Sequence, residues 1–416
     1  MKILVVGGGG REHAIVQTLH KQGHTLWCAP GNGGISQMAT CVPIKATAVD
    51  EMVSYAEKEG FDLVVVAPDD PLAMGMVDKL NEKGIKAFGP CAAAAQIEAS
   101  KAFTKELLAK YNIPTGGFSV CDSAAKAYEI LEHHSLPVVV KADGLALGKG
   151  VYICQTLEQA KQAVSEIMED HLFGEAGSKV LIEEFLTGPE VSFLCFCDGV
   201  HIAPMPAAQD HKRAYDGDKG PNTGGMGAFC PTPTFTEELK EQVIQTIVLP
   251  TVRAMEKEGR PFKGVLYCGL MLTPDGPKVL EYNARFGDPE TQAILPLLKS
   301  DLAEIFLATI DGTLDSLNIE WEDSAAVCIV LASGGYPKKY QSGYEIEGLK
   351  ACEETGALVY HAGTKEENGR FYTAGGRVLG VVQKGKTLKD AIAAGYESVK
   401  TIHFQDMHYR KDIGVK

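Results

Sequence analysis

The stretch P-K-V-L-E-Y-N-A-R-F-G-D-P-E, residues 277–290, decides how the rest of the chain is interpreted. Its first half is an apolar strand pattern, and side chains alternate along a strand, so Glu281, Asn283 and Arg285 are expected on one face. A carboxylate and an amide oxygen at this spacing are typical ligands of Mg²⁺, which also bridges phosphate oxygens. Arg285 adds a planar fork suited to a carboxylate or phosphate. We interpret this face as a magnesium–nucleotide site, because the turn after it adds carboxylates that a merely solvated strand does not need.

Composition bounds what the whole chain can be. Its 416 residues, 45% of them hydrophobic, suffice for two to four domains at ~150 residues each. A formal net charge of −14 argues against nucleic acid or an anionic membrane as a partner, since both attract basic surfaces. No apolar run approaches the ~20 residues of a membrane span, and the first residues lack a signal-peptide cleavage site, so we expect a cytoplasmic protein.

The chain opens with a strand, a glycine turn and a helix. Apolar residues 3–6 run into four glycines at 7–10, and a helical pattern begins at Arg11. Backbone N–H groups at such a helix start can hold a phosphate, although a purely structural turn is equally consistent. The dinucleotide fingerprint fails because its third glycine position is Glu12, which argues against a nicotinamide-dependent dehydrogenase.

Further strand and helix patterns follow within the first hundred residues. The strands expected at 25–29, 62–66 and 85–88 alternate with helices, which predicts a parallel sheet. Asp69 and Asp70 come directly after the second of these strands. Parallel sheets bind ligands at that edge, although aspartates are also common in turns.

Lysines then accompany a helix start and a glycine-rich loop. Ser100 is a predicted N-cap, and Lys101 and Lys105 lie one turn apart on the helix that follows. A cation in the first turn opposes the helix dipole, so Lys101 is interpreted as a ligand contact, with a solvated lysine as the alternative. Lys141 ends an apolar strand that enters A-D-G-L-A-L-G-K-G, where Lys149 adds charge. Such a backbone can close over phosphates without being a Walker loop, and a hairpin with a solvated tip is the alternative.

Another strand is expected at residues 179–184, and it runs into the turn F-L-T-G-P-E. Glu183 and Glu184 are neighbours on a strand and cannot both be buried on one face. The pattern fits a hinge in which the Glu183 side chain and the backbone up to Leu186 contact the edge of an adenine. Glu190 would then reach the ribose hydroxyls. Acidic residues that simply end a strand are the ordinary alternative. The proposed adenine edge comprises Glu183, Glu184, Phe185 and Leu186.

The loop G-P-N-T-G-G-M-G, residues 220–227, has too few apolar side chains to belong to a core. We expect a mobile wall around an anionic or reactive intermediate. From residue 314 short strands bounded by glycine turns predict a separate small α+β domain. Its turns G-G-Y-P and T-A-G-G-R either touch the cleft or close the domain.

Taken together, the strand lysine, glycine loop, hinge and E-x-N pair resemble the ATP-grasp enzymes. Five motifs carry a closer resemblance, to the phosphoribosylamine–glycine ligase family, over essentially the whole chain: G-G-G-G-R-E-H-A, K-A-D-G-L-A-L-G-K-G-V, Q-D-H-K-R, G-P-N-T-G-G-M-G and E-Y-N-A-R-F-G-D-P-E-T-Q. Three positions depart from the family pattern. Ala208 replaces the serine before Q-D-H-K-R, Leu147 stands where alanine is usual, and A-P-D-D-P-L replaces G-P-E-x-P-L. The shorter carboxylate at Asp69 leaves its contact with a sugar phosphate open.

The resemblance implies an α/β and α+β multidomain fold. Its parts would be a Rossmann-like N-terminal domain at 1–99, the start of the ATP-grasp core at 100–186 with a lid at about 115–186, a catalytic half at 187–313 and a C-terminal α+β domain at 314–416. The implied reaction joins glycine to 5-phosphoribosylamine through glycyl phosphate, using ATP and Mg²⁺ or Mn²⁺. The implied assembly is a monomer or weak homodimer.

Residue roles follow from the patterns and the resemblance together. Metal ligands would be Glu281 and Asn283, and catalytic residues Arg285, Lys141 and Asp210. ATP contacts would be Lys101, Lys105, Lys141, Lys149, Glu183, Glu184, Phe185, Leu186, Glu190 and Asn283. Substrate contacts would be Gly9, Gly10, Arg11, Asp69, His211, Lys212, Asn222, Thr223, Gly224, Gly225, Arg285, Gly287, Asp288, Pro289 and Glu290.

Two rival interpretations are weaker. An ATP-grasp ligase for another acid or amine, such as a formate-dependent transformylase or a biotin-dependent carboxylase, is disfavoured by the N-T-G-G-M-G loop. A regulatory nucleotide-binding module with a dead site is disfavoured because Lys141, Glu281, Asn283 and Arg285 are all retained.

Overall fold

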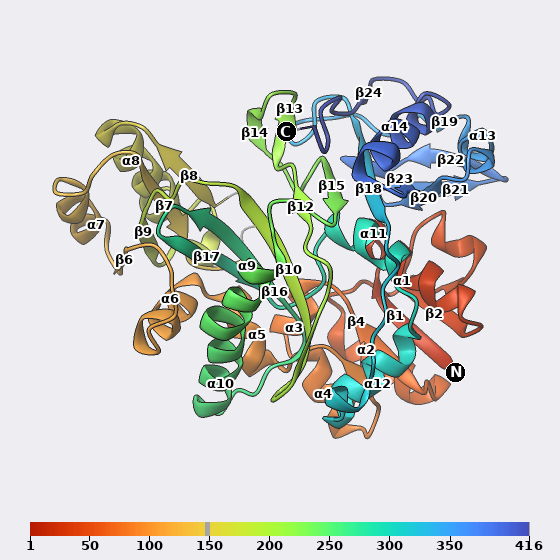
Figure 1. Ribbon diagram of the computed structural model, residues 1–416, viewed down its shortest axis with the longest axis horizontal. Helices are drawn as coiled ribbons and strands as arrows, with labels where there is room; N and C mark the ends of the chain where they lie inside the picture. Colours follow the sequence, from red (N-terminus) through yellow and green to blue (C-terminus); the bar gives the residue numbers. More distant parts are fainter. Residues whose placement is uncertain (146–149, 416) are drawn as a thin grey trace.

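The computed structural model describes residues 1–145 and 150–415, and its N-terminal part is a parallel sheet flanked by helices (Figure 1). The strand order is β3-β2-β1-β4-β5, and β1 pairs in parallel with both β2 and β4. Strand β4 is wholly buried, as its continuous apolar sequence requires. The predicted parallel sheet is confirmed. Its elements are β1 Lys2–Gly7, α1 Gly10–Lys21, β2 Thr25–Pro30, β3 Thr40–Cys41, α2 Val49–Glu59, β4 Leu63–Val66, α3 Asp69–Ala73, α4 Met76–Glu82, β5 Ala87–Phe88 and α5 Ala92–Ala99.

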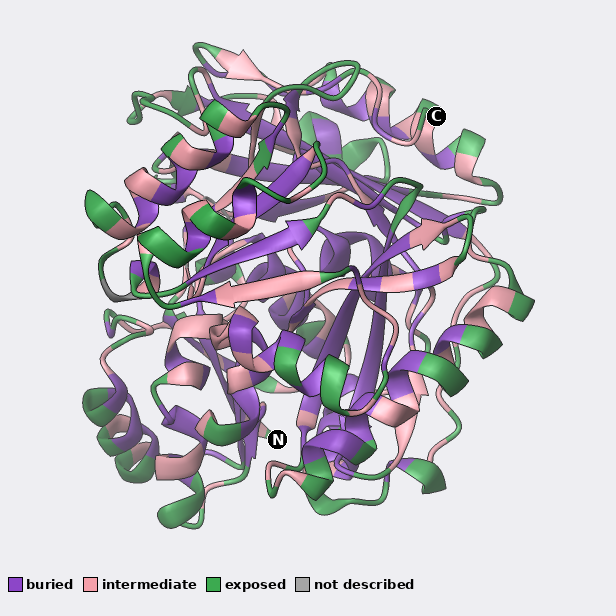
Figure 2. Ribbon diagram, turned by 90° about the vertical axis from the view of Figure 1, so that its left-hand side faces the viewer, coloured by how far each residue is buried: buried purple, intermediate pink, exposed green. Residues whose placement is uncertain are grey.

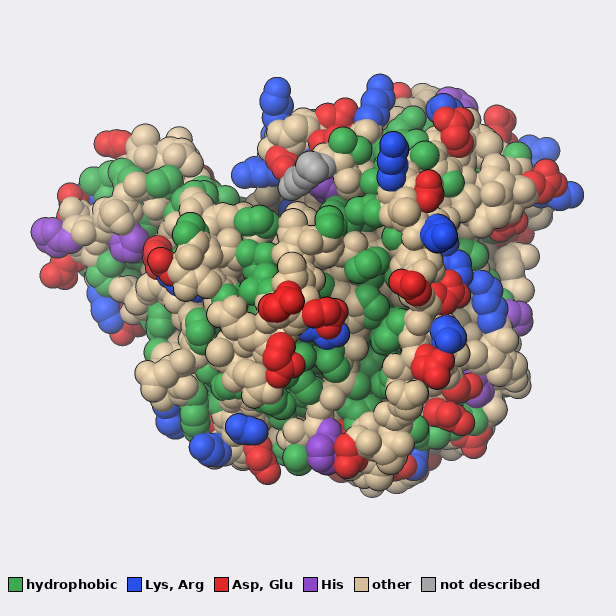
Figure 3. All heavy atoms as spheres, in the orientation of Figure 1, with side chains coloured by type: hydrophobic (Ala, Val, Ile, Leu, Met, Phe, Trp, Pro, Cys, Tyr) green, Lys and Arg blue, Asp and Glu red, His purple; other side chains and the backbone are tan. Residues whose placement is uncertain are grey.

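The lid forms a lobe at the left of Figure 1, with its own small hydrophobic core. Its antiparallel sheet has the order β6-β9-β7-β8. The preceding helix begins as predicted, because the Ser100 hydroxyl accepts a hydrogen bond from the Phe103 N–H at 3.1 Å. Figure 3 shows the lid standing apart from the C-terminal lobe across a hollow. The elements are α6 Lys101–Lys110, β6 Phe118–Cys121, α7 Ala124–Leu131, β7 Val138–Ala142, β8 Val151–Cys154, α8 Leu157–Val164 and β9 Val180–Glu184.

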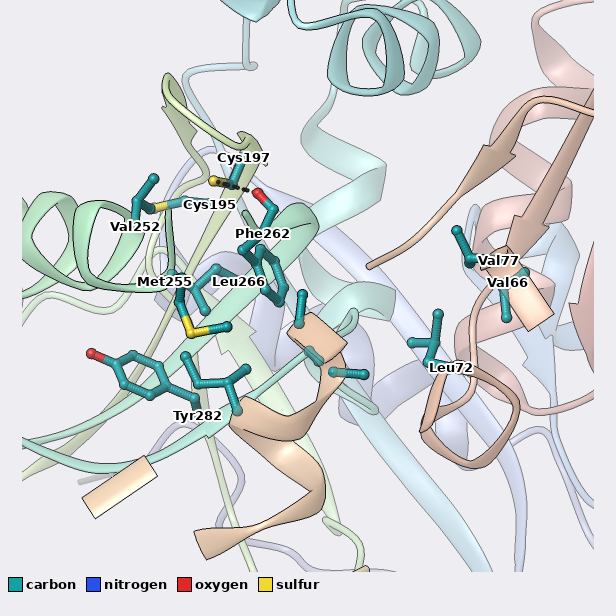
Figure 4. Packing of buried hydrophobic residues seen from close by; sticks show 14 of the residues in the cluster. Val66, Leu72, Val77, Cys195, Cys197, Val252, Met255, Phe262, Leu266 and Tyr282 are labelled. Carbon is teal, nitrogen blue, oxygen red and sulfur yellow. Dashed lines mark hydrogen bonds between the residues drawn. The ribbon is translucent and has the colours of Figure 1, made fainter. Parts of the chain in front are cut away.

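The catalytic half is built on the antiparallel sheet β11-β10-β16-β17. A helical run, continuous through a π segment at Ile244–Val248, packs its apolar face on this sheet. Figure 4 shows Met255 of that run beside Phe262, Leu266 and Tyr282, in a cluster that also contains Val66 of the N-terminal sheet. The two parts therefore share one core. The elements are β10 Glu190–Asp198, β11 Ile202–Pro204, α9 Glu237–Val243, α10 Leu249–Lys257, β16 Lys263–Thr273, β17 Gly276–Asn283, α11 Glu290–Ile294 and α12 Leu302–Asp311.

The C-terminal sheet takes strands from both sides of residue 314. Its order is β12-β15-β18-β23-β20, with β24 also paired to β18, and β15 joins β18 in antiparallel register. Beside it lie a β19-β22-β21 sheet and helices α13 and α14. The segment 209–230, which carries the motifs Q-D-H-K-R and G-P-N-T-G-G-M-G, is thus hydrogen-bonded into this domain. The elements are β12 Gln209–Asp210, β13 Arg213–Tyr215, β14 Lys219–Asn222, β15 Gly227–Cys230, β18 Ala325–Ser333, β19 Glu345–Ile346, α13 Leu349–Glu354, β20 Leu358–His361, β21 Thr364–Glu367, β22 Arg370–Thr373, β23 Arg377–Gly385, α14 Leu388–Val399 and β24 Met407–His408.

Buried strands lie inside the molecule, and the outer faces of the helices are exposed (Figure 2). Within residues 1–145 and 150–415, no helix combines the length and apolar character needed to cross a bilayer. All 11 cysteines are free and most are buried.

Candidate active site

Strand β17 carries the two candidate metal ligands, Glu281 and Asn283, on one face. Glu281 and Asn283 lie opposite Gly269 and Tyr267 of β16, as the alternation predicted, and Leu280 is an extra residue in the ladder. The carbonyl of Leu280 accepts a hydrogen bond from Lys141 Nζ at 3.4 Å. The bulge therefore brings the lid lysine to the strand that carries the carboxylate.

Two lysines converge on one carboxylate inside the lid. Glu183 Oε2 lies 2.9 Å from Lys105 Nζ and 3.0 Å from Lys141 Nζ, and all three side chains are almost fully buried. Burial lowers the pKa of Lys105, against the pull of Glu183. Glu183 Oε1 is buried and has no hydrogen-bond partner among the described residues. One carboxylate thus balances two cations, leaving net positive charge at the expected phosphate position.

The other expected ATP contacts lie around this group. Lys101 Nζ donates to the Gly144 carbonyl at 2.8 Å, so the first-turn lysine reaches the glycine-rich loop. Glu184 is exposed and its carboxylate accepts from the Gly117 N–H at 2.9 Å, whereas Leu186 is buried and Phe185 half-buried. Lys149 lies outside the described residues.

Glu281 is surrounded by cations. Lys212 Nζ lies 3.8 Å from Glu281 Oε1 and 3.4 Å from Glu190 Oε2. Burial raises the pKa of Glu281, but Lys212, Lys141 and other cations outweigh it and hold that pKa below its usual range. A half-buried, ionised carboxylate beside the Asn283 amide oxygen is a hard-oxygen donor set of the kind that Mg²⁺ or Mn²⁺ accepts.

Arg285 follows the strand and joins it to the N-terminal domain. Its Nη2 lies 2.9 Å from Glu98 Oε1 and 3.9 Å from Asp69 Oδ2, and it also donates to Asn283 Oδ1 at 3.3 Å. Its Nε is buried without a hydrogen-bond partner in the described chain. The structure therefore brings Asp69 and Arg285 together.

Asp210 lies among further carboxylates. Burial, together with Glu290, Glu190 and Glu281, raises the pKa of Asp210 to about 7, against the opposing charge of Lys212. Glu290 is itself buried, and its Oε1 accepts from Ser192 at 3.0 Å and Tyr267 at 2.9 Å. Asp210 is thus a candidate proton acceptor, because its neighbours and its burial favour the protonated form.

A carboxylate of the protein itself is already bound at the glycine turn before α1. Glu12 Oε2 accepts from the Gly9 N–H at 2.6 Å, and Glu12 Oε1 accepts from Arg11 Nε at 2.6 Å. Arg11 also donates to the Phe286 carbonyl at 3.1 Å. Glu12 therefore occupies the backbone donor at which we expected a phosphate, while Gly10 packs against Gln292.

The glycine-rich loop is anchored at several points. Thr223 bonds the Lys212 carbonyl through both its N–H, at 2.7 Å, and its hydroxyl, at 2.8 Å, and Asn222 pairs with Arg213. Gly225 has φ +115° and packs against Pro289. Gly287 packs in the same way against the Glu290 carboxylate. These contacts hold the turn in place in this structure, and its expected mobility stays a prediction.

His211 does not lie where the expected substrate contact would place it. Its side chain is fully buried, its ring packs 5.9 Å from Phe229, and its Nε2 accepts from the Gly414 N–H at 2.9 Å. It ties the C-terminal end to β15 and offers no exposed surface to a substrate cleft.

Comparisons with known proteins agree along the whole chain. The description "Phosphoribosylglycinamide synthetase" matches as an N domain over residues 1–98, an ATP-grasp (A) domain over 99–291 and a C domain over 326–416. The phosphoribosylamine–glycine ligase of Caldanaerobacter subterraneus subsp. tengcongensis is 48% identical over 415 residues, covering 99% of each chain. The chain belongs to the phosphoribosylamine–glycine ligase family. A family member from Halalkalibacterium halodurans is 47% identical over 418 residues, 100% of this chain and 97% of that relative.

Solved structures of a family member and of a more distant protein show the same architecture. The crystal structure of the phosphoribosylamine–glycine ligase from Thermotoga maritima has a TM-score of 0.85 and 34% identity, covering 99% of this chain and 100% of that one. The biotin carboxylase domain of Hydrogenobacter thermophilus 2-oxoglutarate carboxylase, solved with MgADP, has a TM-score of 0.74 at 16% identity, over 98% and 91% of the two chains, which shows a shared fold.

Sequence reasoning missed three contributors to the site of this ligase-family chain. Glu98 pairs with Arg285, and Tyr336 and Arg377 of the C-terminal domain hold Gly224. The two turns G-G-Y-P and T-A-G-G-R, which the sequence placed at the cleft or at a domain closure, supply Tyr336 and Arg377. Nothing local singles out Glu98, whose role depends on a partner almost 190 residues away.

Proposed function

We propose that this chain ligates glycine to 5-phosphoribosylamine with ATP, giving glycinamide ribonucleotide, ADP and phosphate by way of glycyl phosphate. One observation carries the proposal. Lid lysines and the acidic end of β17 converge, with Lys141 donating to the carbonyl next to Glu281, in a chain that belongs to the ligase family throughout its length. This convergence supports a site that holds a polyphosphate against a metal-binding carboxylate.

Glu281 and Asn283 would hold Mg²⁺ or Mn²⁺, and the metal would neutralise phosphate charge when bound. The donor set fits, because Glu281 is kept ionised by nearby cations and both oxygens lie on the same face of β17. Lys101, Lys105 and Lys141 supply the remaining positive charge. Positioning and charge neutralisation are what phosphoryl transfer requires from a protein.

Arg285 would hold the glycine carboxylate or the moving phosphoryl group. Its buried Nε has no partner among the described residues, although Glu98 pairs with Nη2 and the Phe286 carbonyl accepts from Nη1. A buried donor of this kind costs stability unless a ligand satisfies it.

Asp210 would serve the second half of the reaction. The amine nitrogen attacks the carbonyl carbon of glycyl phosphate, the bond from that carbon to the phosphate oxygen breaks, and phosphate leaves with the electron pair. The proton released from nitrogen passes to the Asp210 carboxylate, because burial raises the pKa of this group and makes it a better proton acceptor. Closure of the lid would keep water from the acyl phosphate.

The test is ADP release with ATP, Mg²⁺ and freshly generated phosphoribosylamine, with and without glycine, and with the product mass determined. Glycine-dependent ADP together with glycinamide ribonucleotide is expected. ADP release indifferent to glycine, without an amide product, would leave an ATP-grasp enzyme for another acid or amine. Sizing chromatography in the same buffer tests the proposed monomer or weak homodimer of a cytoplasmic enzyme.

A further inference from the structure

Arg377 is the first residue of β23, yet its guanidinium lies in the catalytic half. Nη1 donates to the carbonyls of Gly224 at 2.7 Å and Asp288 at 2.8 Å, with Gly225 O at 3.5 Å. Nη2 lies 3.2 Å from Asp288 Oδ2. One side chain of the C-terminal domain therefore joins two turns, at 224–225 and 288–289, that are separated by more than sixty residues.

Each turn also has a local contact of its own, such as the hydrogen bond from the Gly225 N–H to Thr223 Oγ1 at 3.0 Å. They consist of glycines, an aspartate and a proline, so the buried Pro289 supplies their one apolar side chain. They also touch directly, because a Cβ added at Gly225 would lie 2.4 Å from Pro289 Cδ. The Tyr336 hydroxyl accepts from the Gly224 N–H at 3.0 Å and adds one further contact from the same domain.

The charge balance supports a specific partnership between Arg377 and Asp288. Burial raises the pKa of Asp288, but Arg377 foremost, then Arg11, outweighs it and holds that pKa below its usual range. Gln292 Nε2 donates to Asp288 Oδ1 at 2.7 Å, so both carboxylate oxygens are engaged. Arg377 has only a 22% exposed side chain, and its fork is directed at protein acceptors.

We propose that Arg377 is a positioning residue for the ligase reaction: it holds the 224–225 and 288–289 turns in the arrangement that receives the amine substrate. This inference rests on the proposed function. It assigns the C-terminal domain a role in affinity for the amine and in turnover, while ATP is bound independently by the lid lysines. An arginine suits the task because its planar fork contacts several oxygens at fixed angles, which a lysine cannot do.

The experiment compares R377A and R377K with the full-length parent. Arg370 provides the matched control, because it belongs to the same domain but its pair with Glu345 is exposed at 65% and 40%. We expect R377A to lose about 100-fold in kcat/KM for phosphoribosylamine while KM for ATP stays within about twofold of the parent. R377K should recover only part of that loss, and R370A should behave as the parent.

Hydrogen exchange provides a second readout. In R377A, peptides covering 220–227 and 286–290 should exchange faster, and those from β16 and β17 should not change. Parent-like amine kinetics in R377A, or in R377K if R377A does not fold, would overturn the inference. An equal rise in KM for ATP and the amine would also overturn it, because it would indicate a general structural role. A parent protein without glycine-dependent product would instead refute the proposed function.

Discussion

Lys141 and Glu183 form an ion pair of 3.0 Å inside the lid sheet, where they lie on the paired strands β7 and β9. Lys105 approaches the same carboxylate oxygen from α6 at 2.9 Å. Removing one partner of a buried pair leaves an uncompensated charge, so the three residues are expected to depend on one another. Because the carboxylate balances only one of the two lysines, the group retains positive charge for an ATP phosphate.

Lys141→Ala should weaken ATP binding more than glycine binding. The lost ammonium removes a charge-assisted contact worth about 1.5–3 kcal/mol, which corresponds to a rise in KM for ATP of at least about tenfold. Steady-state kinetics with each substrate varied in turn measures this. Lys161→Ala, on the exposed face of the lid, is the control and should have no effect. A larger effect on glycine than on ATP would mean that the phosphates lie elsewhere.

Glu281→Gln should abolish measurable turnover while the melting temperature stays within about 2 °C of the parent, since the change is nearly isosteric and the side chain is half-buried. The expected cause is loss of an ionised metal ligand. ADP release over a Mg²⁺ titration, alongside a thermal melt, separates the two properties. Glu320→Gln, in an exposed pair with Lys299, is the matched control. Normal activity in Glu281→Gln would refute the metal assignment.

The fold should lose stability on mild acidification through a histidine pair. His361 N–H donates to His13 Nδ1 at 2.8 Å, which joins the C-terminal and N-terminal domains. Burial lowers the pKa of His13 to about 3 and of His361 to about 4, from 6.5. Below pH 6.5 the unfolded chain binds protons at both histidines and the folded chain does not. The free energy of unfolding therefore decreases as the pH is lowered.

Between pH 7 and pH 5 this loss should be on the order of 2 kcal/mol per histidine, measured by urea unfolding at each pH. His13→Asn keeps an acceptor for the His361 N–H and removes one titrating group. Its stability should therefore fall less steeply over the same range. Identical pH dependence in both proteins would show that His13 does not contribute.

Arg410 should be a major stability determinant of the C-terminal end. Its side chain is fully buried and lies 2.9 Å from Asp218 Oδ1 and 2.7 Å from Asp412 Oδ2. Arg410→Met should lower the free energy of unfolding by about 3 kcal/mol, because it removes the buried guanidinium that joins both carboxylates to the Arg213 carbonyl. Denaturant unfolding measures the change, and Arg370→Ala should cost less than about 1 kcal/mol. A similar cost in the two variants would contradict the prediction.

The sequence was sufficient for features set by neighbouring residues. The parallel N-terminal sheet, the Ser100 cap and the alternation of Glu281 and Asn283 on β17 all depend on short-range patterns and are found in the structure. The same holds for Glu183 and Glu184, one buried and one exposed. The motifs that resembled the ligase family identified it correctly, because each is a local run whose order along the chain is itself informative.

Tertiary structure alone decided which partner each long polar side chain reaches. It placed His211 against Gly414 instead of a cleft, and brought Arg377 to the 224–225 turn. No local pattern encodes these pairs. Their partners come from distant segments, and the cost of burying a charge or a backbone donor selects whichever complementary group the packed domains bring within reach.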